Sequence, residues 1–287
     1  MSAVDLESVF TFRGKDVSIY QLGTYAVIGL CLLLFGFPLY WMFVSSIKPV
    51  AAITNFPPEF IPRQVTFAAY DRLFTETGYP TWLKNSIIVS VGDVVFSTLL
   101  ATLAGYALTR YEIPAKKWIA RIFIFGYMFP ILTLGVPYYL IFQRLGMLDT
   151  LPALIIAHTA VILPFATWIM WQFFQTVPIS LEEASWVYGA SRLRGMFEVA
   201  LPSAVPGIVA VAIFAFTIGW SDFTFALLLL STPEQQVLTL GIQGFMQALQ
   251  IYWGNLMAAS AGLVIPPLIV VLLLNRYILA GFTVRAE

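Results

Sequence analysis

The sequence is poor in the residues on which soluble enzymes and metalloproteins depend. Only 10% of its 287 residues are charged, and it has one cysteine and one histidine. Cys31 therefore excludes an intrachain disulfide, and His158 cannot form a metal site alone, so we interpret His158 as a packing residue. The formal net charge is zero and the basic residues form no stripe, so nothing in the sequence indicates nucleic-acid binding and we expect no nucleic-acid partner.

Motifs of nucleotide and peptide hydrolysis are also missing from the sequence. Gly14-Lys15 is followed by Asp16 and has Val9 where a P-loop needs its first glycine, so the phosphate cradle of an ATPase is absent. There is no G-x-S-x-G elbow and no H-E-x-x-H pair. We predict that the chain is not an enzyme and binds no metal or cofactor, so that another chain hydrolyses any ATP that drives it.

Long apolar runs dominate what is present. Hydrophobic residues make up 60% of the chain and the mean hydropathy is +0.85, values too high for a soluble globular protein. Runs of about twenty apolar residues can cross a hydrocarbon core of about 30 Å as helices, because irregular backbone cannot face lipid. We predict an all-α integral membrane protein with a transmembrane domain over residues 22–281 and six spans, at about 22–46, 83–108, 118–142, 151–174, 204–230 and 256–279.

The distribution of basic residues predicts the orientation in the membrane. With the N-terminus inside, ten of the 15 Lys and Arg residues fall on the cytoplasmic side and five outside. Both termini are then cytoplasmic, as an N-terminal segment 1–21 and a tail 282–287. The N-terminal segment lacks the apolar core and cleavage pattern of a signal peptide, so we expect the first span to remain as an anchor in the cell membrane.

Prolines mark the segments where regular helices are expected to fail. Pro130, Pro137 and Pro164 lie inside predicted spans and are expected to loosen or kink them. Loop 49–82 contains several prolines and aromatic residues, and we interpret it as a structural lid rather than a ligand-binding surface.

Two acidic residues lie deep within predicted spans. Asp93 belongs to a stripe of small and polar residues at three- and four-residue steps, so it is expected to face the bundle interior or a cavity. Asp222 follows Trp220-Ser221 and precedes Phe223. We find no basic residue at comparable depth. Three roles stay open: ion coupling, hydrogen bonds to a polar substrate that stacks on the rings of Trp220 and Phe223, and helix packing or unwinding.

Residues 178–203 form a polar, small-residue island between two apolar runs. Pro178 is expected to start and Gly189 to stop a short helix, and Glu182 and Glu183 lie in its first turn, where the helix dipole favours carboxylates. Small residues leave part of this helix without bulky side chains, so that a partner can approach the backbone closely. The pattern predicts either a docking helix or an ordinary loop helix.

The spacing within this island resembles the EAA loop of the membrane subunits of ABC importers. The matching residues are Glu183-Ala184, Gly189-Ala190, Leu201-Pro202 and Pro206. In that family the loop forms a coupling helix seated in a groove on the ATPase subunit. Tyr188 stands where the family usually has an acidic residue. The resemblance implies a coupling contact made by Glu182, Glu183, Ala184, Gly189 and Ala190, with Arg192 and Arg194 near the interface.

Further motifs resemble those of sugar-uptake ABC permeases, typified by the smaller membrane subunit of the maltose transporter. The tail departs from that family, because it lacks the usual glycine-rich ending. Trp220-Ser221-Asp222-Phe223 stands where the family often has Trp-Asn-Glu-Phe. Other matching motifs are Gly105-Tyr106-Ala107, Met128-Phe129-Pro130, Gly146-Met-Leu-Asp-Thr150 and Leu163-Pro164-Phe165.

The resemblance implies the type I ABC importer permease fold and sugar uptake by alternating access. A second, different permease subunit would pair with this chain across a pore, together with two ATPase subunits that use ATP and Mg²⁺ and an extracellular sugar-binding protein. The expected pore residues are Asp93, Trp220, Ser221, Asp222 and Phe223. An ion-coupled secondary transporter, a permease for a glycerol-phosphate-type solute and a membrane scaffold remain as alternatives.

Overall fold

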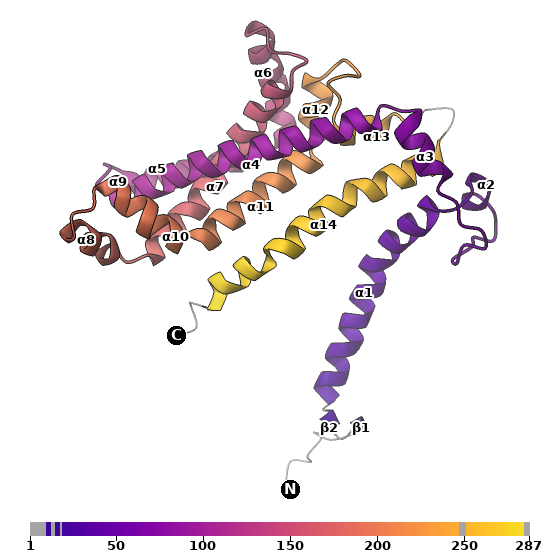
Figure 1. Ribbon diagram of the computed structural model, residues 1–287, viewed down its shortest axis with the longest axis horizontal. Helices are drawn as coiled ribbons and strands as arrows, with labels where there is room; N and C mark the ends of the chain where they lie inside the picture. Colours follow the sequence, from indigo (N-terminus) through magenta and orange to yellow (C-terminus); the bar gives the residue numbers. More distant parts are fainter. Residues whose placement is uncertain (1–9, 13–14, 18, 247–250, 284–287) are drawn as a thin grey trace. The chain divides into compact units, whose positions relative to one another are not determined.

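The computed structural model describes residues 10–12, 15–17, 19–246 and 251–283. Most of the expected N-terminal segment, and residues 284–287 of the expected tail, lie outside this described part. The chain forms two compact units, residues 1–72 with 252–261 and residues 73–251 with 262–287. Helices make up most of the secondary structure in both (Figure 1).

In the first unit a long apolar helix follows a small hairpin. Strands β1 (Phe10–Phe12) and β2 (Lys15–Val17) pair antiparallel, so the all-α prediction is wrong for this short segment. Helix α1 (Ile19–Ser46) covers the first predicted span. It is followed by α2 (Val50–Ile53) and by the start of α3 (Ala68–Thr75).

The segment that follows α1 folds back on the end of that helix. The backbone N–H of Thr66 donates to the carbonyl of Ile47 at 2.9 Å, which closes the segment between them into a loop. The Tyr40 hydroxyl donates to the carbonyl of Phe60 at 2.6 Å and so ties the loop to α1. These bonds hold the loop in one conformation.

Lys48 supports this loop from inside. Its ammonium group donates to the carbonyl of Glu59 and lies 4.3 Å from the centroid of the Trp41 ring. Burial lowers the pKa of Lys48, and the nearby Glu59 carboxylate opposes that shift. A loop built around a buried, bonded lysine supports the interpretation of this region as a structural lid.

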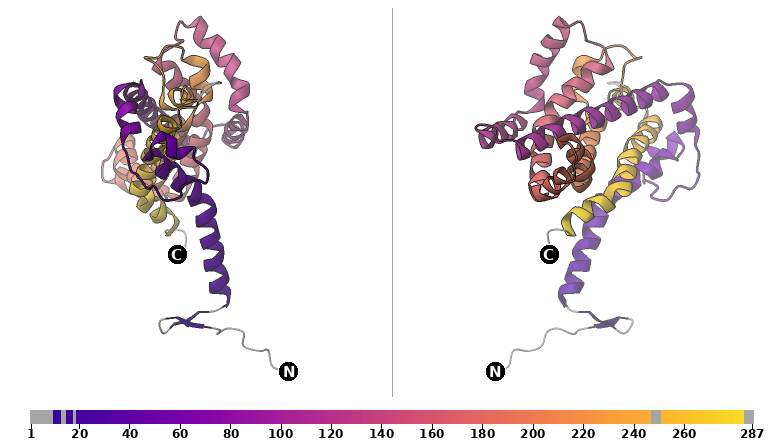
Figure 2. Two further views of the ribbon diagram at one scale, coloured as in Figure 1. Left: turned by 90° about the vertical axis from the view of Figure 1, so that its right-hand side faces the viewer. Right: turned by 60° about the vertical axis from the view of Figure 1, so that its left-hand side comes forward.

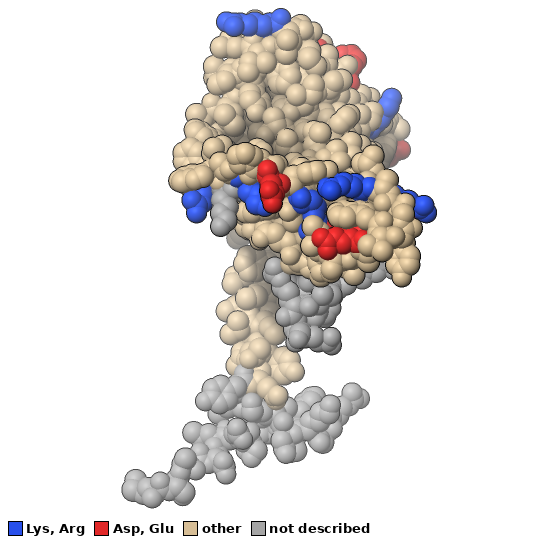
Figure 3. All heavy atoms as spheres, turned by 90° about the vertical axis from the view of Figure 1, so that its left-hand side faces the viewer, with Lys and Arg blue, Asp and Glu red and all other residues tan. Residues whose placement is uncertain are grey.

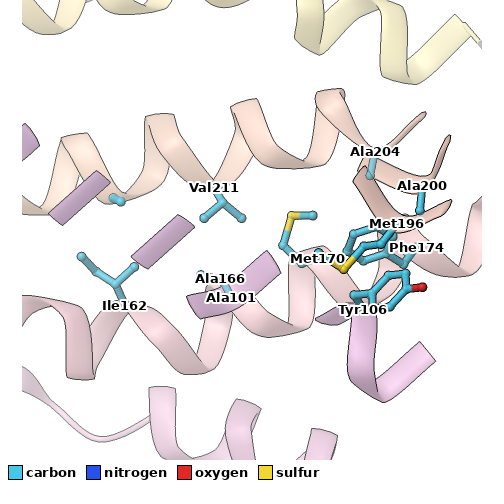
Figure 4. Packing of buried hydrophobic residues seen from close by; sticks show 11 residues of the cluster. Ala101, Tyr106, Ile162, Ala166, Met170, Phe174, Met196, Ala200, Ala204 and Val211 are labelled. Atoms are coloured by element: carbon cyan, nitrogen blue, oxygen red, sulfur yellow. The ribbon is translucent and has the colours of Figure 1, made fainter. Parts of the chain in front are cut away.

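Three long helices form the core of the second unit. They are α4 (Tyr79–Arg110), α7 (Leu151–Thr176) and α11 (Val205–Ser221), which lie alongside one another (Figure 1). Lipid is as apolar as the side chains between such helices, so close packing rather than water exclusion holds them together. The buried side chains between them include Ala101, Tyr106, Ile162, Ala166, Met170, Phe174 and Val211 (Figure 4).

The third predicted span is broken. Helices α5 (Lys116–Tyr127) and α6 (Ile131–Arg144) meet at 92°, so the span expected over 118–142 is not one continuous helix, and the expected kink at Pro130 is confirmed (Figure 2). Pro130 explains the break, because it has no N–H to donate and sits in an extended conformation directly before α6. Pro137 lies inside α6 without ending it.

The fifth predicted span is interrupted as well. Helix α11 ends before residues 222–223, and α12 (Thr224–Leu229) resumes beyond them, so the continuous helix expected over 204–230 is wrong. Helices α13 (Leu238–Gln243) and α14 (Trp253–Thr283) follow. In the described part of the chain, four helices are long and apolar enough to cross a membrane, or up to six if two bent pairs, 121–127 with 131–144 and 192–203 with 205–221, are each one span.

The loops that follow α6 and α12 are clasped together by Asp149. Its backbone N–H donates to the carbonyl of Leu229 at 2.7 Å, and its carboxylate accepts the N–H groups of Ser231 at 2.8 Å and Thr232 at 3.0 Å. Burial raises the pKa of the Asp149 carboxyl, but the backbone donors outweigh burial and leave the pKa below its ordinary value. The clasp therefore connects the end of α12 to the loop between α6 and α7, just before α7 (Leu151–Thr176) begins.

Gly105 allows α4 and α7 to approach each other closely. A Cβ there would lie 2.6 Å from the Cβ of Met170 and 2.8 Å from the backbone nitrogen of Trp171. We expect Gly105→Ala to destabilise the protein by about 1–3 kcal/mol, because an overpacked helix contact must shift. Gly126→Ala is the control, since a Cβ there meets no atom within 4 Å. Thermal unfolding in detergent checks this, and equal melting temperatures for the two variants would contradict it.

Candidate functional site

A run of short helices at one end of the core carries the residues expected to dock a partner. Helix α8 (Ile179–Val187) begins directly after Pro178, and Gly189 follows its end with a φ of 89°, which glycine adopts without strain. We call residues 178–203 the coupling segment. It continues through α9 (Arg192–Gly195), the π-helix η1 (Met196–Ala200) and α10 (Leu201–Ser203).

The carboxylate of Glu182 anchors α8 to the end of α4. Arg110 Nε lies 2.6 Å from Glu182 Oε1, and the Tyr106 hydroxyl donates to Oε2 at 2.7 Å. Arg110 also donates to the carbonyls of Val177 at 2.9 Å and Phe174 at 3.4 Å. The Arg110 side chain is 8% exposed and that of Glu182 is 0% exposed, so each supplies the counter-charge that the other needs.

This burial corrects the role expected of Glu182. A side chain with no exposed surface cannot contact another subunit, so the expected docking contact of Glu182 is wrong. Its carboxylate instead holds in place the helix on which the other docking residues lie. The charged head of Arg110 is used in the same anchor and is not part of the surface.

The outer face of the coupling segment exposes apolar side chains. Val187 is 86% exposed and Tyr188 is 92% exposed. Leu181 on α8 and Leu193 and Phe197 beyond it are also exposed. Several exposed apolar side chains on one short segment are typical of a site of interaction with a protein or a membrane.

The other residues expected to dock lie at or near the surface. Glu183 and Ala184 are exposed on α8, and Ala190 is partly exposed just after it. A Cβ on Gly189 would meet no atom within 4 Å, so the space beside this turn is open. These positions are accessible to a partner, and their docking role stays a prediction.

Two arginines brace the coupling segment. The guanidinium of Arg192 lies 5.1 Å from the centroid of the Trp186 ring, and Trp186 packs so closely on Gly195 that a Cβ there would lie 2.8 Å from the indole nitrogen. Arg194 pairs with Glu198 at 2.9 Å on the surface. Figure 3 looks onto this end of the core and shows basic and acidic side chains spread over it. The apolar patch therefore lies among charged side chains, as in a solvated surface.

A second polar cluster lies inside the helix core. His158 on α7 places Nδ1 2.8 Å from Asp93 Oδ2 on α4, and Nε2 3.3 Å from Asp222 Oδ2 at the end of α11. The exposed fractions of the three side chains are at most 8%. We call Asp93, His158 and Asp222 the polar triad. It places a basic side chain at the depth of the carboxylates, where the sequence predicted none, and His158 is buried between helices as expected of a packing residue.

The stripe around Asp93 faces the bundle interior, as its spacing predicts. Ser90 and Ser97 are fully buried beside it on α4. Gly219 on α11 makes room for the triad, because a Cβ there would overlap Asp93 Oδ2 and lie 3.3 Å from the Cα of Ser90. Close approach of α11 to α4 therefore depends on glycine at this position.

Asp222 is bonded to groups of the protein itself. Its carboxylate accepts the N–H groups of Phe225 at 3.4 Å and Ala226 at 3.1 Å, and so caps the first turn of α12. Its backbone carbonyl accepts the Thr239 hydroxyl at 2.5 Å. Of the three roles that the sequence left open, these contacts favour helix packing for Asp222.

The other residues expected at the pore differ from one another in accessibility. Trp220 is buried, its indole N–H donates to the carbonyl of Leu263 at 2.8 Å, and its ring stacks on Phe216 with centroids 5.5 Å apart. Its ring is therefore not open to a sugar, and the stacking role expected of Trp220 does not hold in this structure. Ser221 is exposed and Phe223 is partly exposed, so both remain accessible.

Sequence reasoning missed the Glu182–Arg110 anchor and the bridging role of His158. The signal for the anchor was an arginine at the end of an apolar span, far from Glu182 in sequence. The signal for the triad was a lone histidine in one span and single carboxylates in two others, since such groups need partners in a membrane. Neither signal gives the pairing, because the pairing depends on which faces of α4, α7 and α11 meet.

Comparison with known proteins gives consistent results over most of the chain. Residues 97–283 match the family described as binding-protein-dependent transport system inner membrane component. The chain is 32% identical to the inner membrane ABC transporter permease protein YcjP of Escherichia coli (strain K12), over 92% of this chain and 95% of that protein. It is 32% identical to the trehalose transport system permease protein SugB of Mycobacterium tuberculosis (strain CDC 1551 / Oshkosh), over 90% of this chain and 92% of that protein.

A solved structure shows the fold. A chain from a bacterial ABC transporter involved in the import of the acidic polysaccharide alginate matches with a TM-score of 0.80 and 23% identity, over 94% of this chain and 99% of that chain. The helices of the described residues thus have the arrangement of a type I ABC importer permease.

The buried anchor predicts a large difference between two neighbouring glutamates. We expect Glu182→Gln to destabilise the protein by about 3–5 kcal/mol, because Arg110 then stays buried without a counter-charge. Glu183→Gln is the control, since that carboxylate is exposed and its loss is expected to change stability by less than about 0.5 kcal/mol. Unfolding of both variants in detergent measures the difference. The anchor would be contradicted if Glu182→Gln were as stable as its neighbour.

Proposed function

The chain belongs to the family of binding-protein-dependent transport system inner membrane components, and on that premise we propose that it is one permease subunit of an ATP-binding-cassette importer for a di- or oligosaccharide. It is a multi-pass protein of the cell membrane. In the proposed cycle of alternating access, ATP hydrolysis on separate subunits moves the coupling segment, and the helix core carries this motion to the pore.

One observation carries the proposal, namely an apolar surface on a firmly anchored helix. Val187 and Tyr188 are almost fully exposed among charged side chains, which is unfavourable unless another protein covers them. The same helix is tied to α4 through the buried pair of Glu182 and Arg110. A subunit that docks on α8 and moves it would therefore act directly on a core helix.

The proposed assembly follows from this docking surface and from the family. Two ATPase subunits, which bind ATP and Mg²⁺, lie beneath this chain and a second, different permease subunit. An extracellular sugar-binding protein delivers the solute. In this arrangement the chain has six spans with both termini in the cytoplasm, which puts the coupling segment on the side where ATP is found.

An uncharged sugar suits the chemistry of the core better than a phosphorylated solute. One relative takes its name from trehalose. A phosphate is bound best by cationic groups with free donors. His158 does not offer one, because both of its nitrogens face the carboxylates of Asp93 and Asp222. The polar triad therefore favours the sugar over a glycerol-phosphate-type solute.

The docking surface predicts a selective loss of the ATPase subunit. We expect Val187→Asp to reduce co-purification of the ATPase with the permease at least tenfold, because a charge on this surface would be buried without a partner. Ile61→Asp is the control, since Ile61 is 78% exposed but lies outside the coupling segment. Pull-down from detergent extracts measures both. Equal losses, or none, would count against docking at α8.

The proposed energy source predicts the inhibitors to which uptake responds. In vesicles that contain the chain with its partner subunits, we expect ATP-dependent uptake of a disaccharide that vanadate abolishes and an uncoupler leaves unchanged. Radiolabelled trehalose and maltose are the first probes, delivered with the binding protein. Uptake by this chain alone that an uncoupler abolishes would instead establish the ion-coupled alternative.

A further inference from the structure

The polar triad lies where α4, α7 and the end of α11 meet. Each of its three buried polar side chains depends on the other two for a partner. A neutral imidazole carries one N–H, whereas an imidazolium carries one on each nitrogen. Only the charged form of His158 can therefore donate to both Asp93 and Asp222. Each of these groups would be costly to bury alone among apolar helices, and each offsets the cost of the others.

The contact between His158 and Asp93 is the firm half of the triad. The two atoms are 2.8 Å apart, and the side chains are 1% and 0% exposed. They connect α7 and α4, which pack together along much of their lengths. Gly219 closes the space on the side of α11, because any larger residue there would overlap the Asp93 carboxylate. This half has no room in which to separate.

The contact between His158 and Asp222 is the weaker half. The two atoms are 3.3 Å apart, and the Asp222 side chain is 8% exposed. The Asp222 carboxylate also accepts the N–H groups of Phe225 and Ala226, so it keeps two donors when it leaves the imidazole. It lies at the non-helical break between α11 and α12, where the backbone can bend without breaking a helical turn.

We propose that His158 is a positioning residue for transport. In the resting permease it holds the break between α11 and α12 against α4 and α7. It releases Asp222 when the ATPase subunits drive the change of state. This inference rests on the proposed function as an importer permease. It goes beyond that function in naming the contact that opens and the one that stays closed.

Release of Asp222 would move more than one short helix. Phe225 on α12 stacks on Tyr138 of α6, with ring centroids 5.4 Å apart, and its ring lies 6.0 Å from that of His158. The Asp149 clasp ties the far end of α12 to the loop between α6 and α7, two residues before α7 begins. Release of Asp222 would therefore move the first turn of α12 together with the part of α6 that stacks on Phe225.

Two conservative substitutions separate the halves of the triad. The amide nitrogen of His158→Asn lies near the position of Nδ1, so it can donate to Asp93 but is too short to reach Asp222. The amide nitrogen of His158→Gln lies near the position of Nε2 and can still donate to Asp222. The first variant removes the weaker contact, and the second keeps it. Membrane insertion and yield of both variants control for folding.

A distance measurement tests the proposal without relying on transport. Ile156 on α7 and Leu227 on α12 are each 50% exposed and can carry spin labels at introduced cysteines, after Cys31→Ser removes the native thiol. We expect the distance between the labels to change between the nucleotide-free importer and the importer trapped with ATP and vanadate. In His158→Asn the nucleotide-free sample should already contain the trapped distance, enriched about tenfold over the parent, because the contact with Asp222 is lost. His158→Gln should show a smaller enrichment than His158→Asn, because its amide can still donate to Asp222.

The outcomes distinguish the proposed release of Asp222 from the transport function on which it rests. An unchanged distance on trapping, in vesicles that do take up sugar with ATP, would overturn the proposed release of Asp222 from His158 and leave the proposed function standing. The same holds if His158→Asn and the parent have identical distances in the nucleotide-free state. Absence of ATP-driven uptake in the parent would overturn the proposed function itself.

The ratio of sugar transported to ATP hydrolysed provides a second readout. If Asp222 leaves His158 before the sugar is bound, the permease should stimulate ATP hydrolysis without delivering sugar. We therefore expect His158→Asn to lower this ratio several-fold and His158→Gln to restore most of it. A purely structural role would reduce uptake and hydrolysis in proportion, at an unchanged ratio. An unchanged ratio in His158→Asn would therefore also overturn the proposal.

Discussion

The need to pair every buried charge is the constraint on which this structure depends. Apolar side chains favour contact between helices but do not specify which faces meet, because lipid would cover the same faces equally well. A buried carboxylate is far more selective, since it needs an opposite charge and hydrogen bonds in the right place. Glu182 finds both in Arg110 and Tyr106, and Asp93 finds its partner in His158. These contacts fix the rotation and the register of α4 against the elements that surround it.

Helix α4 carries the inner partner of both polar clusters and therefore links them mechanically. Arg110 holds the coupling segment at one end of α4, and Asp93 holds the polar triad about 25 Å further along, at ~1.5 Å of rise per residue. A continuous helix transmits displacement along its axis with little loss. The segments that are broken, between α5 and α6 and between α11 and α12, lie outside this rod. The fold thus combines a rigid element that reaches from the docking surface to the core with breaks at which the remaining helices can bend.

The sequence predicts the helices of this fold better than the contacts between them. Apolar runs identify every long helix, and Pro178 and Gly189 mark the limits of α8, because these signals are local. Pro130 predicts the bend in the third span, and helix unwinding was one of the roles left open for Asp222 in the fifth, but apolar runs continue through both positions and do not show how far each helix is interrupted. Glu182 looked like a docking residue because Arg110, its partner, lies 72 residues earlier in the chain. Trp220 was expected in the pore for its flat ring, whereas its burial depends on Leu263, which no local pattern connects to it.

The polar triad also bears on the choice between an ATP-driven permease and an ion-coupled transporter. Two carboxylates in apolar spans, taken alone, suggest a site that binds and releases protons or sodium ions. Such a site needs carboxylate oxygens that are free to take up the ion. Here both oxygens of Asp222 are engaged by the first turn of α12, and Oδ2 also faces His158, whereas Asp93 Oδ2 faces His158 and Asp93 Oδ1 has no hydrogen-bond partner among the described residues. The Asp222 carboxylate is therefore explained as part of a contact between helices. In the proposed importer the energy for movement enters elsewhere, at the exposed apolar face of the coupling segment.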